Sequence, residues 1–137
     1  MARMQIWFVD DRLENHDTWL ASFPDDVQAA CTLRTFESVP ALFQVLDAGE
    51  RPDVLFVDFF LRGHTGEEVL DRVLHDGGAV PLLIAHSSLD RANVAMVHLG
   101  AHLALAKHKG RRRTQSIVEA VPDLAALHAL RDAHLGA

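Results

Sequence analysis

The chain has 137 residues, a net charge of −6 with histidine counted as neutral, and a composition that is 49% hydrophobic and 23% charged. This length and composition suit one globular domain, and they argue against intrinsic disorder and against a general attraction to nucleic acid or anionic membranes. Cys31 is the only cysteine, which excludes an internal disulfide and is typical of a reducing compartment, so we expect a cytoplasmic protein. No apolar run approaches the ~18 residues that a membrane-spanning helix needs.

Short apolar runs alternate with longer amphipathic stretches in the first half of the chain. Residues 5–9 form a continuous apolar run that predicts a buried strand, and helical spacing of apolar residues follows. Residues 27–35 alternate loosely and predict an edge strand. Ser38 is placed to cap a helix that ends near Gly49. The buried faces predicted for the two helices are Leu13, His16, Leu20 and Phe23, then Leu42, Val45 and Leu46.

The second half of the chain repeats this pattern more clearly. Residues 54–57 predict a buried strand, and Thr65 with Glu68 has the spacing of a capping box at the start of a helix. Residues 80–85 and 103–106 predict two further strands, with a short helix between them. The helical faces predicted here are Val69, Leu70, Val73 and Leu74, then Val94, Val97 and Ala101, and finally Ile117, Val121, Leu124 and His128.

Five strands alternating with five helices predict an α/β protein whose parallel sheet is covered by helices on both faces. In such sheets the binding groups collect at the carboxyl ends of the strands. The polar residues at these ends are Asp10 and Asp11, then Asp58, then His86, Ser87 and Ser88, and finally Lys107. Carboxylates, a polar cluster and one ammonium group are therefore predicted to meet at one edge of the sheet.

The residue types at this edge indicate a particular chemistry. Carboxylates that share a dry site need a counter-charge, and oxygen ligands select a hard cation such as Mg²⁺ or Ca²⁺. Lys107 adds a compact positive charge that can hold a phosphate oxygen. A carboxylate nucleophile beside Mg²⁺ and a lysine favours phosphoryl transfer to an aspartate. The alternatives are that Asp10 and Asp11 cap the following helix and that Lys107 is a solvated side chain.

Four ordered segments of the sequence carry a resemblance to a known family. They are Phe8-Val9-Asp10-Asp11, the segment from Pro52 to Asp58, Gly63 with Gly66, and the segment from Gly100-Ala101 to Lys107. Asp58 lies six positions after Pro52 and eight before Gly66, which is the spacing of that family. From about residue 5 to residue 107, the chain resembles the receiver domain of bacterial two-component response regulators.

The resemblance implies a fold and a domain organisation. The fold would be flavodoxin-like, a doubly wound five-stranded parallel sheet in the order 2-1-3-4-5 with helices on both faces. Residues 1–137 would form a single receiver-like domain in which 111–137 are the C-terminal helical segment, and no output domain is expected.

The resemblance also implies a role for each site residue. Asp58 would be the phosphoacceptor, and Lys107 would pair with its phosphoryl group. Asp11 would bind Mg²⁺ directly and Asp10 through water, with Asp58 and the backbone carbonyl of Phe60 as further ligands. The phosphodonor would be a histidine kinase or a phosphotransfer protein, and the output a contact with an unknown downstream protein. No nucleic-acid or membrane partner is expected, and homodimer formation is left open.

The sequence departs from the family at the ends of the fourth and fifth strands. The family carries threonine or serine where counting from Pro81 reaches His86, and Ser87 takes that role if the strand end shifts by one residue. His86 could donate a hydrogen bond to a phosphoryl oxygen, or it could pack on the loop as a half-buried residue. Ala104 stands where the family has an aromatic residue, and His108 stands where it has proline.

Three functions are compatible with these residues. The first is a stand-alone receiver that is phosphorylated on Asp58 and acts through protein contacts, and that is no enzyme beyond its own phosphorylation and dephosphorylation. The second is a receiver-like adaptor that signals without phosphorylation, given the residues at His86, Ala104 and His108. The third is a phosphatase with Asp58 as its nucleophile, and it ranks last because no substrate-binding insertion is visible in the sequence.

Overall fold

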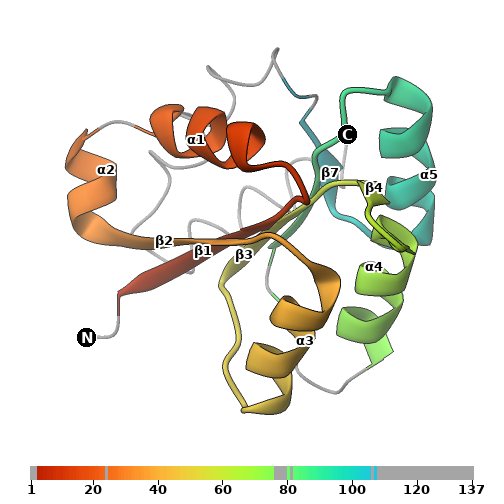
Figure 1. Cartoon of the computed structure of the whole chain (residues 1–137), viewed down its shortest axis with the longest axis horizontal. Helices are drawn as coiled ribbons and strands as arrows, with labels where there is room; N and C mark the ends of the chain where they lie inside the picture. The colour runs from red at the N-terminus through yellow and green to blue at the C-terminus, as the bar shows by residue number, and fades with distance from the viewer. Residues whose placement is uncertain (1–2, 24, 76–79, 81, 106, 108–137) are drawn as a thin grey trace.

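The computed structural model describes residues 3–23, 25–75, 80, 82–105 and 107 (Figure 1). The predicted helical segment of residues 111–137 and the bond between Lys107 and His108 lie outside the described residues. The fold is therefore described up to the lysine that the sequence places at the end of the last strand.

Five strands of the described chain form one parallel sheet. They are β1 (Met4–Val9), β2 (Cys31–Phe36), β3 (Val54–Val57), β6 (Leu82–Ala85) and β7 (Leu103–Ala104). Neighbouring strands pair in the order β2-β1-β3-β6-β7, and all of these pairs are parallel. Counted over these five strands alone, the order is 2-1-3-4-5, which confirms the flavodoxin-like sheet expected from the sequence.

The central strands are buried on both faces. Phe8 and Phe56 belong to the apolar cluster on one face, and Trp7 and Leu55 belong to the cluster on the other. Alternate residues of a strand point to opposite faces of a sheet, so a strand that is buried on both faces has a continuous apolar sequence. For this reason the sequence predicts β1 and β3 at nearly their observed bounds.

Helices cover both faces of the sheet, as predicted (Figure 1). They are α1 (Leu13–Ala21), α2 (Asp25–Ala30), α3 (Val39–Asp47), α4 (Gly66–His75) and α5 (Asp90–Leu99). Trp19 of α1 and Val27 of α2 join the cluster that contains Phe8. The other three helices pack on the face that contains Trp7. No helix in the described part of the chain is long and apolar enough to cross a membrane.

The ends of α3 lie where the sequence predicts them. The Ser38 side chain accepts a hydrogen bond from the backbone N–H of Ala41 at 3.2 Å, which caps the first turn. After the last turn, Gly49 adopts a φ of 93°, a conformation that glycine tolerates without strain. Local capping chemistry is therefore enough to set both ends of this helix.

The edge strand predicted over residues 27–35 is partly wrong, because α2 takes the first part of it and β2 occupies only Cys31–Phe36. Asp25 and Asp26 lie in the first turn of α2, where acidic side chains stabilise a helix. The Gln28 side chain donates a hydrogen bond to a backbone carbonyl of the preceding loop at 3.0 Å. Because glutamine and alanine are also good helix formers, the weak alternation is overridden by a helical turn.

The buried face predicted for α5 is wrong at Val94 and Val97, which are 56% and 39% exposed, whereas Asn93 and Met96 are buried. The Asn93 amide accepts a hydrogen bond from the N–H of Ser87 at 2.8 Å and donates one to the Ser87 carbonyl at 3.0 Å. Because these bonds satisfy the amide inside the protein, a polar residue takes the inward position and two valines point outward.

A hairpin that the sequence did not indicate lies between β3 and α4. Its strands, β4 (Phe60–Leu61) and β5 (His64–Thr65), pair antiparallel across a turn in which Gly63 has a φ of 74°. Each strand has two residues, which is too short for an alternating pattern to be visible.

The buried face predicted for α1 is wrong at one position, because Leu13 is 61% exposed at the start of the helix.

Candidate functional site

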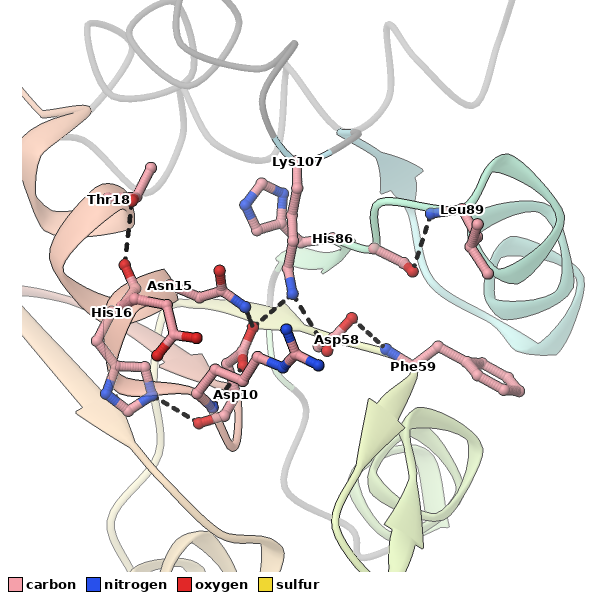
Figure 2. A network of polar contacts seen from close by, with 12 residues as sticks. Asp10, Asn15, His16, Thr18, Asp58, Phe59, His86, Leu89 and Lys107 are labelled. Carbon is pink, nitrogen blue, oxygen red and sulfur yellow. Dashed lines mark hydrogen bonds and ion pairs between the residues drawn. The ribbon is translucent and has the colours of Figure 1, made fainter.

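Three charged side chains from three different strands meet at the carboxyl edge of the sheet. Asp10 directly follows β1, Asp58 directly follows β3, and Lys107 lies beyond the end of β7. The Lys107 Nζ atom is 2.5 Å from Oδ2 of Asp10 and 3.2 Å from Oδ2 of Asp58. Dashed lines in Figure 2 mark both contacts. The sequence predicted that these residues would meet, because the carboxyl ends of parallel strands share one edge.

Asp10 is fully buried and is held by three donors. The backbone N–H of Arg12 donates to its Oδ1 at 2.9 Å, and the Asn15 side chain donates to its Oδ2 at 3.0 Å. The Lys107 ammonium is the third donor and supplies the opposite charge. A buried carboxylate costs little only when it is paired and hydrogen-bonded in this way, so Asp10 has a fixed position.

Asp58 is also buried, but its carboxylate has less support. Its Oδ1 accepts a hydrogen bond from the backbone N–H of Phe59 at 2.9 Å, and its Oδ2 faces Lys107. Burial raises the pKa of the Asp58 carboxyl above its ordinary value; the Lys107 ammonium opposes that rise and the Asp10 carboxylate adds to it. Burial therefore disfavours the charged form of the Asp58 carboxyl.

Gly66 leaves room for the segment that carries Asp58. A Cβ atom at Gly66 would lie 2.6 Å from the Asp58 backbone carbonyl and 2.7 Å from the Met96 sulfur. The N–H of Gly66 donates to the carbonyl of Phe59 at 2.8 Å, which fixes this close approach. The spacing between Asp58 and Gly66 thus has a steric cause in this chain.

The acids can also supply ligands to a metal ion. Asp10, Asp11 and Asp58 each offer a carboxylate oxygen, and these oxygens lie within 4.8 Å of one another. Two opposite ligands of Mg²⁺ are about 4.2 Å apart, since each Mg–O bond is about 2.1 Å. Adjacent ligands are closer, at about 3.0 Å, so the three oxygens could bind one ion only if they moved toward one another or if water took part as a ligand. Hard oxygen donors of this kind are the type that Mg²⁺ prefers.

A cavity of about 460 Å³ opens at this edge of the sheet. Five residues that the sequence places at this edge line it, namely Asp11, Asp58, Phe60, Ser88 and Lys107. It is also lined by residues that the sequence did not assign to the site, among them Arg12, Asn15, Arg62 and His64. Arg12 and Asn15 follow Asp10 and Asp11 closely in the sequence, so their place at the cavity could have been predicted. Arg62 and His64, in contrast, reach the cavity only through the unpredicted hairpin.

His86 and Ser87, the candidates at the end of β6, do not line this cavity. The His86 ring points away from the Asp58 carboxylate in Figure 2, and its Nδ1 lies 2.6 Å from the carbonyl oxygen of Leu105. The Ser87 hydroxyl accepts a hydrogen bond from the N–H of Leu89 at 3.2 Å. Ser88, one position further on, is the residue of this segment that lines the cavity.

No family model matches the sequence, and no curated protein matches it. Solved structures match the fold. The signal receiver domain of a DNA-binding response regulator from Colwellia psychrerythraea 34H is similar with a TM-score of 0.68 at 18% identity, covering 85% of this chain and 98% of that chain. A chemotaxis response regulator of Vibrio cholerae has a TM-score of 0.69 at 15% identity, covering 86% and 98%. The N-terminal domain of an uncharacterized protein from Wolinella succinogenes has a TM-score of 0.67 at 24% identity, covering 86% and 92%. The chain therefore has the fold of response-regulator receiver domains.

Proposed function

We propose that this chain is a phosphoacceptor signalling domain in which Asp58 receives a phosphoryl group from a histidine kinase or a phosphotransfer protein. The observation that carries the proposal is the Lys107 ammonium, which lies 3.2 Å from the Asp58 carboxylate at the wall of an open cavity. A solvated lysine or a simple helix cap does not explain a cation held between two buried acids. The receiver fold of the similar structures also supports this function.

The chemistry follows from the charges at the site. An Oδ atom of Asp58 attacks the phosphorus of the donor's phosphohistidine, a P–O bond forms, and the P–N bond breaks with its electron pair going to the imidazole. Lys107 offsets the negative charge on the phosphoryl oxygens, and Asp10 holds Lys107 in place. Mg²⁺ bound by Asp10, Asp11, Asp58 and the backbone carbonyl of Phe60 would neutralise further charge during transfer.

The residues around the cavity favour a protein as the phosphodonor. Leu13, Phe60 and Leu89 are 61%, 55% and 48% exposed, and each either lines the cavity or directly follows a residue that does. Exposed apolar side chains gathered at one opening are typical of a contact surface. Signalling would then proceed through contacts between proteins, with residues 1–137 acting as one domain.

A second candidate function is a receiver-like adaptor that signals without phosphorylation. It is favoured by the end of β6, where the polar groups of His86 and Ser87 already bond to Leu105 and Leu89. In such a protein the acidic site would be retained, but its occupation would not change the surface that partners contact.

Titration with beryllofluoride and Mg²⁺, followed by calorimetry, separates these functions. We expect saturable, Mg²⁺-dependent binding to the wild type that is lost in Asp58→Ala and in Asp11→Ala. Asp17→Ala is the matched control, because Asp17 is an exposed acid of α1, and it should bind like the wild type. A folded wild type that binds no beryllofluoride would favour the adaptor, and steady turnover of small phosphate esters would favour a phosphatase.

A further inference from the structure

His86 is a buried residue at the same carboxyl edge of the sheet as the charged groups of the site. It follows β6 and is 8% exposed. Its ring packs edge-to-face against Phe8 and Phe56, with both pairs of ring centroids 5.5 Å apart. Its Nδ1 lies 2.6 Å from the carbonyl oxygen of Leu105. Since a carbonyl oxygen can only accept, Nδ1 carries the proton and donates this hydrogen bond.

Phe8, Phe56 and Leu105, which the His86 ring contacts, share one feature. Each lies two positions before a charged residue of the site: Phe8 before Asp10, Phe56 before Asp58, and Leu105 before Lys107. Residues two apart in an extended strand point to the same face of the sheet. The imidazole therefore touches, in one place, residues that lie close in sequence to all three charged groups.

The segment that carries Lys107 depends on these contacts. β7 has two residues and lies at the edge of the sheet, so it has β6 as its sheet neighbour. Beyond β7, the N–H of Leu105 donates to the carbonyl of Ala85 at 2.9 Å, and the N–H of Lys107 donates to the carbonyl of Ser87 at 3.2 Å. The His86 side chain holds the remaining backbone group of Leu105, its carbonyl. The His86 side chain thus adds a hydrogen bond to the backbone pairing that continues beyond the two residues of β7.

We propose that His86 is a positioning residue that fixes Lys107 relative to Asp10 and Asp58 and does not touch the phosphoryl group itself. The proposal rests on the proposed function of the same site. His86 holds the lysine through the carbonyl of Leu105, and the two phenylalanine rings hold the imidazole against the strands that carry the acids. The residue type that departs from the family pattern thereby acts through the backbone of the neighbouring strand.

Three variants separate this role from direct contact with the phosphoryl group. His86→Phe keeps a ring but lacks the Nδ1 donor, whereas His86→Asn loses the ring but places an amide N–H near the position of Nδ1. We expect His86→Phe to weaken beryllofluoride binding by about tenfold, a usual coupling for residues in one hydrogen-bond network, and His86→Asn to recover most of the loss. Ser87→Ala should bind as the wild type does, because its hydroxyl faces Leu89.

The double variant with Lys107→Ala tests whether the effect passes through the lysine. In that background, His86→Phe should cause no further loss of affinity. Equal losses in both backgrounds, or equal losses in His86→Phe and His86→Asn, would overturn the proposal. Circular dichroism shows which variants fold, and His86→Leu, which also lacks the Nδ1 donor, carries the double-variant test if His86→Phe does not fold.

A ligand-free measurement keeps this proposal separate from the proposed function. In ¹⁵N NMR spectra of the wild type, we expect the His86 Nδ1 to be protonated, and we expect the Lys107 ammonium signal to shift in His86→Phe but not in Ser87→Ala. If the wild type fails to bind beryllofluoride but these shifts occur, the phosphoacceptor function is wrong and the positioning role stands. An unchanged Lys107 signal in a folded His86→Phe variant contradicts the positioning role.

Discussion

Asp11 and Asp58, which follow β1 and β3, line the cavity, whereas the polar side chains that directly follow β6, those of His86 and Ser87, point into the protein. Asp58 lines the cavity with a carboxylate that burial destabilises. The side chains of His86 and Ser87 instead form hydrogen bonds with the neighbouring backbone. Under the proposed function, the acidic half of this edge accepts the phosphoryl group and the other half positions Lys107, so changes to the two halves should have different effects.

Lys107 joins the two halves, and its removal should have the largest effect. In Lys107→Ala, Asp10 and Asp58 lose the cation that lies between them. We therefore expect the free energy of unfolding to fall by about 3–5 kcal/mol. Beryllofluoride affinity should fall by about 100-fold, because a charged donor to the phosphoryl oxygens is missing. Arg91→Ala is the control for loss of an exposed cation. Denaturant unfolding and calorimetry would contradict the account if both variants matched the wild type.

Gly66→Ala should disturb the acidic half through backbone geometry. The added Cβ atom would collide with the Asp58 carbonyl and the Met96 sulfur, at a cost of about 1–3 kcal/mol. Because the collision moves the segment of Asp58, beryllofluoride affinity should fall as well. Gly49→Ala is the control: it carries the strain of a positive φ in open space and should lose stability with no change in affinity. Equal affinities in the two variants would show that Gly66 does not position the acceptor.

Asp58→Asn should reveal how burial affects the Asp58 carboxyl, through the pH dependence of the protein's stability. Folding raises the pKa of Asp58, so its contribution to stability is greatest below the ordinary aspartate pKa and is lost as the pH rises through the raised value. The Asp58→Asn variant does not lose this stability, because its amide does not ionise. We expect it to be more stable than the wild type by about 1 kcal/mol at neutral pH, with the difference shrinking in acid. Thermal melts over that pH range would contradict the prediction if the difference grew in acid.

Substitution of Arg62 or Arg12 should have the smallest effect on beryllofluoride binding. Both line the cavity, and neither side chain forms an ion pair with a residue in the described part of the chain. Arg62→Ala or Arg12→Ala should weaken beryllofluoride binding by a few-fold at low salt, with the difference vanishing as salt screens exposed charges. A difference that persists at high salt would instead indicate direct coordination of the anion.

The sequence was sufficient for the parts of the molecule that depend on local pattern. Because β1 and β3 are buried on both faces, each strand appears in the sequence as a continuous run of apolar residues. Asp10 and Asp58 directly follow these runs. Parallel pairing then places these acids and Lys107 at one edge. The meeting of the three charged residues was predictable because it depends on strand ends and not on side-chain detail.

The parts that the sequence could not predict depend on contacts between distant segments. The β4–β5 hairpin brings Arg62 and His64 to the cavity, but its strands are too short to leave a pattern. His86 has a polar ring that can point to the cavity or to the interior. Its orientation is set by Leu105, which lies 19 positions away and belongs to another segment. The inward turn of Asn93 likewise depends on the backbone of Ser87.

The most direct test of the account is intact-mass spectrometry after incubation with acetyl phosphate and Mg²⁺, a small donor that needs no knowledge of the partner. The account predicts a gain of one phosphoryl group in the wild type and in Asp17→Ala, and no gain in Asp58→Asn. A gain that persists in Asp58→Asn, or its absence from a folded wild type that binds Mg²⁺, would contradict the assignment of Asp58 as the phosphoacceptor.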